Sequence, residues 1–223
     1  MFETVGSDAL RWFLMSSPIL RGGDLQISKD GKQMHEVVRL VLNPIWNAYY
    51  FFTLYANTDG VKARLRYDQT AVLDRYALSK TRAMVDGVQQ RMDEYDLAGS
   101  CQEVKEYLDA LNNWYIRRSR PRFWGESGDA DRQSAYDTLY TCLVTLCRAV
   151  APMLPLLAEK VYTGLTGEDS VHLADWPDAS VLPQDLQLVA QMDRVRDGCS
   201  VGLALRENAK RRTRLPLSKV TLA

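Results

Sequence analysis

The sequence has few of the residues that enzymes most often use for catalysis or metal binding. Its two histidines, His35 and His172, lie far apart, one at the start of an expected helix and one in an expected loop, where a surface role is usual. No two of its four cysteines form a closely spaced pair, and none has a histidine nearby. They are Cys101, Cys142, Cys147 and Cys199. Because zinc ligands normally come in close pairs, we expect no metal site.

Motifs for nucleotide binding and nucleophilic catalysis are also missing. Neither of the glycine-rich patterns GxxxxGK[ST] and GxGxxG occurs. Ser119 and Ser200 have no neighbouring base that would activate them. Acidic pairs such as Asp93 and Glu94 lie on expected helix faces, where solvation or ion pairing is the usual fate of a carboxylate. We therefore expect no catalytic residue in this chain.

The sequence lacks a long uncharged run, a signal peptide and a net charge. No stretch of about 18 apolar residues occurs, so we expect no membrane span. The start, MFETVGSDALRW, has no basic region followed by an apolar run, and together with the cysteine usage this favours a cytoplasmic location. Lys+Arg and Asp+Glu balance at 28 each. Binding to nucleic acid would therefore depend on local clusters of charge.

Helical periodicity is the strongest pattern that the sequence does contain. Apolar residues recur at three- and four-residue steps, and the apolar fraction of 46% is enough for a core. Long helices are expected over residues 70–95, 101–118, 131–150 and about 184–208. A shorter helix is expected after Pro152 and Pro155, ending near Gly164–Gly167. The segment SDALRWFLMSS predicts an opening helix with Ser7 or Asp8 as its N-cap.

Two prolines and one alternating segment modify this picture. Residues 31–56 form a long apolar segment in which Pro44 predicts a kink or a break at Asn43. Pro121 predicts the end of the helix expected over residues 101–118, with Arg120 extended before it. The segment GGDLQISKDGK is expected to be a loop or a brief strand, and residues 170–184 are expected to be a loop. The final RRTRLPLSKVTLA predicts a strand from the near alternation of Leu215, Leu217 and Val220. The expected fold class is all-α, a bundle of roughly five or six helices with a small strand-containing appendage at the C-terminus.

Arginines and aromatic residues cluster in Asn113–Trp124, NWYIRRSRPRFW. Four arginines and four aromatics occur there without an acidic residue. They are Trp114, Tyr115, Arg117, Arg118, Arg120, Arg122, Phe123 and Trp124. In one interpretation the arginines pair with carboxylates of neighbouring helices while the aromatics fill the core. In the other, the guanidinium groups bind RNA phosphates and one or two rings stack on a base or sugar. The residues alone leave both interpretations open.

A second basic cluster lies near the C-terminal end, where Glu207 is the single acidic residue. Its members are Arg206, Lys210, Arg211, Arg212, Arg214 and Lys219. A basic run of this kind is often a solvated surface. If it binds RNA, each phosphate that it neutralises should steepen the dependence of affinity on salt.

Several segments resemble the isoleucyl-tRNA synthetases, a family of class I aminoacyl-tRNA ligases, and the resemblance covers essentially the whole chain. SDALRWFLMSSPILRGGDL is similar to the segment that closes their catalytic half, and its residues 8–11 match the "DALR" motif of synthetase anticodon-binding regions. LNPIWNAYYFF, which contains Trp46 and Asn47, is similar to the first helix of the family's bundle. Asn113–Trp124 is the specific match, because the valyl, leucyl and methionyl relatives share the bundle but differ there.

The resemblance implies an anticodon-binding helical bundle that binds the anticodon stem and loop of isoleucine tRNA. The two ATP-binding signatures of class I synthetases, of the HIGH and KMSKS type, do not occur in the sequence, and neither does an editing domain. We therefore expect a segment of a larger enzyme, inactive alone and without a cofactor of its own. The intact enzyme is implied to join L-isoleucine to its tRNA with ATP and magnesium.

The resemblance and the two clusters together give the expected RNA-binding residues. They are Trp46, Asn47, Trp114, Arg117, Arg118, Arg120, Arg122, Arg211 and Arg212. The expected partner is isoleucine tRNA, with no DNA and no membrane, and the expected state is a monomer. Residues 1–30 are expected to end the catalytic or stem-contact region, 31–168 to form the bundle, and 169–223 to form a helix with a strand appendage. One alternative stays open, a structural bundle that braces the catalytic domain while RNA is bound elsewhere.

Overall fold

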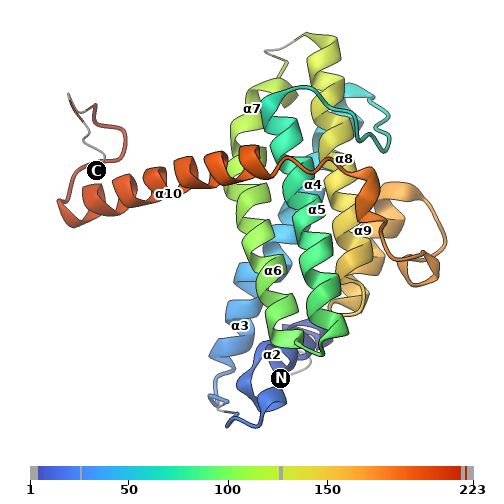
Figure 1. The fold of residues 1–223 in the computed structure, drawn as a ribbon, viewed down its shortest axis with the longest axis vertical. Helices are drawn as coiled ribbons and strands as arrows, with labels where there is room; N and C mark the ends of the chain where they lie inside the picture. The colour runs from blue at the N-terminus through green and yellow to red at the C-terminus, as the bar shows by residue number, and fades with distance from the viewer. Residues whose placement is uncertain (1–4, 26, 126–127, 217–218, 220–223) are drawn as a thin grey trace. The chain divides into compact units, whose positions relative to one another are not determined.

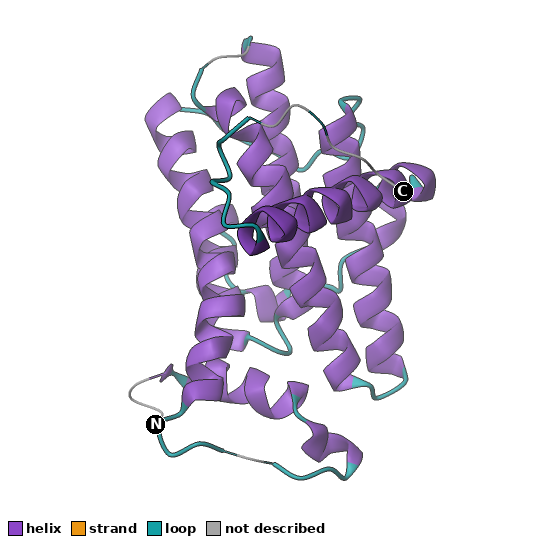
Figure 2. Cartoon of the chain, turned by 90° about the vertical axis from the view of Figure 1, so that its left-hand side faces the viewer, coloured by secondary structure: helices purple, strands orange, loops and turns teal. Residues whose placement is uncertain are grey.

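The structure, a computed structural model, describes residues 5–25, 27–125, 128–216 and 219. These residues are helical or lie in turns and loops, and none of them forms a strand (Figure 2). The all-α fold class is therefore confirmed. No helix in these ranges is both long enough and apolar enough to cross a membrane. The contacts divide the chain into two compact units, Met1–Asp185 and Leu186–Ala223. The division by function at residues 30 and 168 stays a prediction.

The first unit is a bundle of long helices lying side by side (Figure 1). Its α-helices are α2 (Ser7–Ser16), α3 (Lys32–Val37), α4 (Asn43–Asp59), α5 (Val72–Asp93), α6 (Leu97–Asp109), α7 (Arg117–Phe123), α8 (Asp129–Val150) and α9 (Pro155–Thr166). Two π-helical segments, η2 (Val38–Leu42) and η3 (Ala110–Ile116), join α3 to α4 and α6 to α7. Short 3-10 turns are η1 (Pro18–Arg21), η4 (Val171–Leu173) and η5 (Ala179–Val181). The expected helices at 70–95, 131–150 and after Pro155 are confirmed.

The core of the bundle forms around α8, which packs against α5 on one side and α9 on another. Leu139, Leu143 and Leu146 of α8 are fully buried at the three- and four-residue spacing that predicted this helix. Cys142 and Cys147 lie on the same helix as free, buried thiols. Burial raises the pKa of the Cys142 thiol to about 11 and that of Cys147 to about 12. Both cysteines therefore serve as small core residues.

Neither internal proline breaks its helix, so the helix end predicted at Pro121 is wrong. Pro121 lies inside α7, and the helix continues to Phe123, with the Trp124 N–H donating to the Arg120 carbonyl at 3.0 Å. Pro44 lies in the first turn of α4, and Asn43 before it is helical. In both places a π-helical segment comes directly before the α-helix that holds the proline. A π turn changes the register of the hydrogen bonds, which lets the chain accommodate a residue without an N–H.

Asp8 caps a different helix from the one predicted. The N-cap of α2 is Gly6, and no side chain of the described residues caps that end of the helix. The Asp8 carboxylate instead accepts hydrogen bonds from the N–H groups of Leu157, at 2.7 Å, and Leu156, at 3.4 Å, in the first turn of α9. A carboxylate at this place satisfies orphan donors and complements the helix dipole. The N-cap prediction was wrong because the bond joins residues that are far apart in the sequence.

The described part of the second unit comprises α10 (Leu186–Asn208) and a turn after it. This confirms the last expected helix. Its apolar residues, however, do not form a buried stripe, because no residue of α10 is buried. The Arg206 guanidinium holds the following turn through the carbonyl groups of Arg212, Thr213 and Leu215. The predicted C-terminal strand is absent from the described residues, where Leu215 lies in a bend. Leu217 and Val220, its other two members, lie outside them.

Candidate nucleic-acid interface

The arginines of Asn113–Trp124, the Arg–aromatic cluster, lie on several sides of α7. Arg117, Arg118 and Arg120 are exposed, whereas the Arg122 side chain is only 13% exposed. Successive residues of an α-helix are turned by about 100°, so adjacent arginines point in different directions. The structure therefore separates residues that are consecutive in sequence into different environments.

Arg122 is held inside the bundle by two carboxylates. Its Nη1 and Nη2 donate to the two carboxylate oxygens of Asp74, a fully buried residue of α5, at 2.6 and 2.8 Å, and its Nε donates to Asp131 at 3.0 Å. The Tyr115 hydroxyl donates to the same Asp74 at 2.9 Å. Burial disfavours the charged guanidinium, but the bonds to Asp74 outweigh it and raise the pKa of Arg122. Arg122 thus pairs with carboxylates of neighbouring helices, as the first interpretation of the cluster expects. RNA binding by Arg122 stays a prediction.

Arg118 stacks on a ring of its own helical segment. Its guanidinium carbon lies 3.6 Å from the centroid of the Trp114 ring, a cation–π contact. Trp114 is only 8% exposed, and its Nε1 has no hydrogen-bond partner among the described residues. Trp114 is therefore a core ring that is covered by Arg118, and Arg118 is the member of the pair that solvent can reach.

Arg117 and Arg120 share one exposed face of α7 with Trp124. The three residues follow at steps of three and four, which places them in one row along the helix. Neither arginine has an ion pair with any carboxylate in the ranges that the structure describes. Trp124 is 53% exposed, and its Nε1 donates to the Tyr55 hydroxyl of α4 at 2.9 Å. The sequence prediction left Trp124 out of the site, although its spacing from Arg117 and Arg120 was a signal that could have included it.

Helix α4 lies beside this row. The rings of Phe51 and Phe123 meet edge to face at 5.0 Å, and Tyr55 contacts Trp124, which defines the α4–α7 seam. Asn47 is exposed and lies one helical turn before Phe51, on the side of α4 that faces α7. The seam therefore has Asn47 on one side and the row of Arg117, Arg120 and Trp124 on the other.

Trp46 lies away from this seam. It is 41% exposed, and the centroid of its ring lies 5.4 Å from the centroid of the Tyr49 ring. The Tyr49 hydroxyl closely approaches Gly164, which places this side of α4 against α9. The structure therefore separates Trp46 and Asn47, which are adjacent in the sequence.

Arg211 and Arg212 belong to the second unit, where both are exposed in the turn after α10. The Arg211 N–H donates to the Arg206 carbonyl at 2.8 Å, and the Arg206 side chain in turn bonds to the Arg212 carbonyl. Their backbone is thus folded back on the end of α10 while both side chains remain accessible to solvent.

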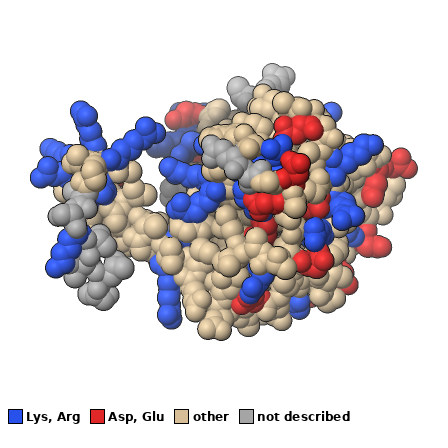
Figure 3. Space-filling model, turned by 90° about the horizontal axis from the view of Figure 1, so that it is seen from above, with Lys and Arg blue, Asp and Glu red and all other residues tan. Residues whose placement is uncertain are grey.

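Charge on the bundle is mixed. Figure 3 looks onto the end of the molecule where α7 meets α8, and there Lys and Arg side chains lie among Asp and Glu. This agrees with a sequence that carries 28 residues of each sign. Attraction for a polyanion would therefore come from local groups of unpaired arginines, such as Arg117 and Arg120.

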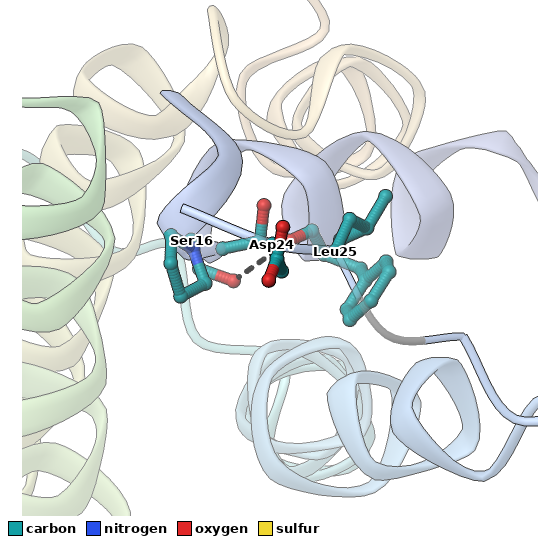
Figure 4. Close-up of a pocket in the computed structure, with 6 residues that line it drawn as sticks. Ser16, Asp24 and Leu25 are labelled. Atoms are coloured by element: carbon teal, nitrogen blue, oxygen red, sulfur yellow. Dashed lines mark hydrogen bonds between the residues drawn. The ribbon is translucent and has the colours of Figure 1, made fainter. Parts of the chain in front are cut away.

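Two further features of the described residues concern small ligands and metal ions. A shallow pocket beside α2, shown in Figure 4, has one carboxylate, that of Asp24, and a hydrogen bond of 3.3 Å from the Ser16 hydroxyl to the Phe13 carbonyl. Its lining residues are Phe13, Ser16, Ser17, Pro18, Asp24 and Leu25. Groups of three or more His, Cys, Asp or Glu side chains that could hold a metal ion do not occur in the described ranges.

A family model for the anticodon-binding domain of tRNA ligase matches residues 74–221, more than half of the chain. The chain belongs to this anticodon-binding domain family. The match includes the Arg–aromatic cluster of α7 and the tail arginines, Arg211 and Arg212, while Trp46 and Asn47 lie before it.

Several curated proteins are similar in sequence to the whole of this chain. It is 51% identical over 223 residues to proteins named isoleucine–tRNA ligase from Leifsonia xyli and from Nocardia farcinica, and 48% identical to one from Mycobacterium tuberculosis. In each case the alignment covers 100% of this chain and 20% of the relative, so the chain spans a fifth of their length.

One solved structure shares the fold of this anticodon-binding domain. It is the ternary complex LeuRS–tRNA–LeuAMS of Agrobacterium radiobacter, with a TM-score of 0.59 and 14% sequence identity. The similarity covers 84% of this chain and 21% of that one. At this level of identity the comparison concerns the fold of the helical bundle.

Proposed function

We propose that this chain binds the anticodon stem and loop of isoleucine tRNA as one module of an isoleucine–tRNA ligase. The observation that carries the proposal is the 51% identity over 223 residues to proteins of that name, in a chain that belongs to the anticodon-binding domain family. The intact enzyme would join L-isoleucine to its tRNA with ATP and magnesium. Those groups would bind to other parts of the enzyme, so the chain alone would be inactive.

The α4–α7 seam is the part of the surface that best suits RNA. Arg117 and Arg120 are exposed without an ion pair to any carboxylate in the described ranges, so their guanidinium groups are free to take phosphate oxygens in a forked geometry. Asn47 offers an amide on the opposite side of the seam, where it can donate to a sugar or phosphate. Arg118 lies at the edge of the same segment. We propose that these four residues make the principal contacts.

The other residues that were predicted to bind RNA would have smaller or indirect roles. Trp114 and Arg122 would act indirectly, since one supports Arg118 and the other ties α7 to α5. Trp46 would contact RNA outside the seam. Arg211 and Arg212 would add electrostatic contacts from the second unit.

Charge reversal tests the seam. The variant Arg117→Glu/Arg120→Glu should bind isoleucine tRNA more weakly, and the slope of log affinity against log salt should fall by roughly 0.7–0.9 for each phosphate that is no longer neutralised. The matched control is Lys105→Glu/Lys160→Glu, which reverses two exposed charges on α6 and α9. Fluorescence anisotropy with labelled tRNA across a salt series measures both quantities, and circular dichroism checks helicity. Equal binding by wild type and seam variant in low salt would contradict the site.

A bundle that only braces the catalytic domain is the second candidate, and the Arg122–Asp74 ion pair favours it at that residue. Under this alternative, an arginine-to-alanine series along α7 would lower the melting temperature and leave RNA affinity unchanged. From the resemblance to this class of enzyme we also propose a monomer in the cytoplasm. Sedimentation velocity tests the monomer, and a concentration-dependent dimer would contradict it.

A further inference from the structure

Trp124 is an exposed aromatic residue whose ring is fixed in place. It is the C-cap of α7, and its backbone N–H still bonds to the helix. The indole Nε1 donates to the Tyr55 hydroxyl at 2.9 Å. The Tyr55 ring packs against the Phe51 ring, with 4.9 Å between their centroids. Trp124 nevertheless remains 53% exposed. The single polar atom of the ring is therefore satisfied within the bundle, and an apolar surface of defined orientation is left to solvent.

The charges around Trp124 suit the approach of a polyanion. Arg120 and Arg117 precede it on the same face of α7, about 6 and 10 Å away along the helix axis. Asp59, one turn after Tyr55 on α4, is already compensated. It accepts a hydrogen bond from the Tyr136 hydroxyl at 2.7 Å and lies 3.9 Å from the Arg132 guanidinium. Among the described residues, Trp124 thus has two unpaired cations beside it and a neutralised carboxylate behind it.

We propose that Trp124 is a stacking platform for one unpaired base of the RNA held in the α4–α7 seam, which rests on the function proposed above. A flat aromatic ring stacks on any base, because every base has a π face. The base must be unpaired, since the faces of paired bases are covered by their neighbours in a duplex. Arg120 and Arg117 would then hold phosphates of the same strand, so the aromatic and the arginines act on consecutive parts of one RNA.

The test compares three variants with two RNAs. Trp124→Ala should weaken binding of the isoleucine tRNA anticodon stem–loop by roughly tenfold, the scale of one base–aromatic stacking interaction. The salt slope should stay unchanged, because the variant keeps every arginine that binds a phosphate. Trp124→Phe should retain most of the affinity. Tyr55→Phe should give a smaller loss than Trp124→Ala, since the indole is kept but no longer held. A duplex of the same stem without its loop should bind equally to all four proteins.

A fluorescent purine analogue placed in the loop reports stacking directly, and its emission should be quenched by wild type and not by Trp124→Ala. If Trp124→Ala binds the stem–loop as tightly as wild type while Arg117→Glu/Arg120→Glu does not, the platform is wrong and the proposed function stands. If wild type does not bind the stem–loop, the proposed function itself fails. An equal loss for stem–loop and duplex, together with a lower melting temperature, would make Trp124 a structural residue and overturn the inference.

Discussion

At the scale of single residues, Arg122 and Asp74 form the ion pair that joins α7 to α5. Asp74 is fully buried, and both of its oxygens are bonded to the guanidinium. A buried pair of this kind gains little net stability, because both charges lose their hydration. Removing one partner is costly, since the remaining charge is then buried without compensation. The pair therefore fixes which side of α7 faces the core.

This gives a prediction for stability. Arg122→Ala should lower the free energy of unfolding by about 3–5 kcal/mol, because Asp74 would be left buried and unpaired. Urea denaturation followed by circular dichroism measures the change. The matched control is Arg118→Ala on the same segment, whose partner is an aromatic ring and whose loss should cost about 1 kcal/mol or less. Similar effects for the two variants would contradict this account of Arg122.

The sequence alone showed the Arg–aromatic cluster but could not show which of its arginines are buried and which are exposed. Clustering of residue types is a local property, and it is visible in NWYIRRSRPRFW without a structure. The buried partner of Arg122, Asp74, lies 48 residues earlier, and no local pattern joins the two. The same limit applies to Asp8, which looked like the cap of its own helix and instead caps α9. Separating core arginines from exposed ones required the fold.

At the scale of elements, Asp96 forms the turn between α5 and α6. It is the N-cap of α6, and its carboxylate accepts a hydrogen bond from the Gly99 N–H at 2.9 Å. Arg91 donates to the same carboxylate at 3.0 Å, and Arg21 of η1 forms a further ion pair with it. The Gly99 N–H first, and then Arg21, lower the pKa of Asp96. One side chain thus joins α5, η1 and α6.

The lowered pKa predicts how stability depends on pH. A carboxyl group with a depressed pKa in the folded state adds stability above its unfolded pKa of about 3.9 and loses it as pH falls through the folded value. Asp96→Asn keeps an N-cap side chain but has no charge. Wild type should therefore be more stable than this variant near neutral pH, and the difference should shrink as the pH falls below about 4. Melting curves across pH measure it, and a difference that does not change with pH would contradict the assignment.

Helices were predicted correctly where many apolar residues repeated at a helical period. A helix end that was predicted from a single proline was wrong. The apolar stripes of α5 and α8 repeat over many residues, so both helices could be placed from sequence. Pro121 gave the wrong helix end, because the preceding π-helical segment and the burial of Phe123 carry the helix past it. The C-terminal strand was expected from a short alternation. A strand needs a partner to pair with, and the described residues offer none.

At the scale of the whole molecule, the two units differ in how their helices are stabilised. Most helices of the first unit share a large hydrophobic core, in which large side chains such as Tyr136 and Leu143 are fully buried, and α2 and α3 also form a smaller cluster around Ala9 and Met34. Helix α10 of the second unit has no buried residue, although Leu186, Val201 and Leu205 are apolar and exposed. Most helical stability in proteins comes from packing of an apolar face. The bundle should therefore fold without α10.

Truncation after Asp185 tests this independence. The shortened chain should keep the melting temperature of the bundle within a few degrees, because the helix that it removes has no buried residue. A control that ends at Val150 removes α9, whose Val161 and Tyr162 are buried, and should not fold cooperatively. If Arg211 and Arg212 contact RNA, the truncation at Asp185 should also bind tRNA with a shallower salt slope than the full chain. A bundle that unfolds when α10 is removed would show that the second unit is part of its core.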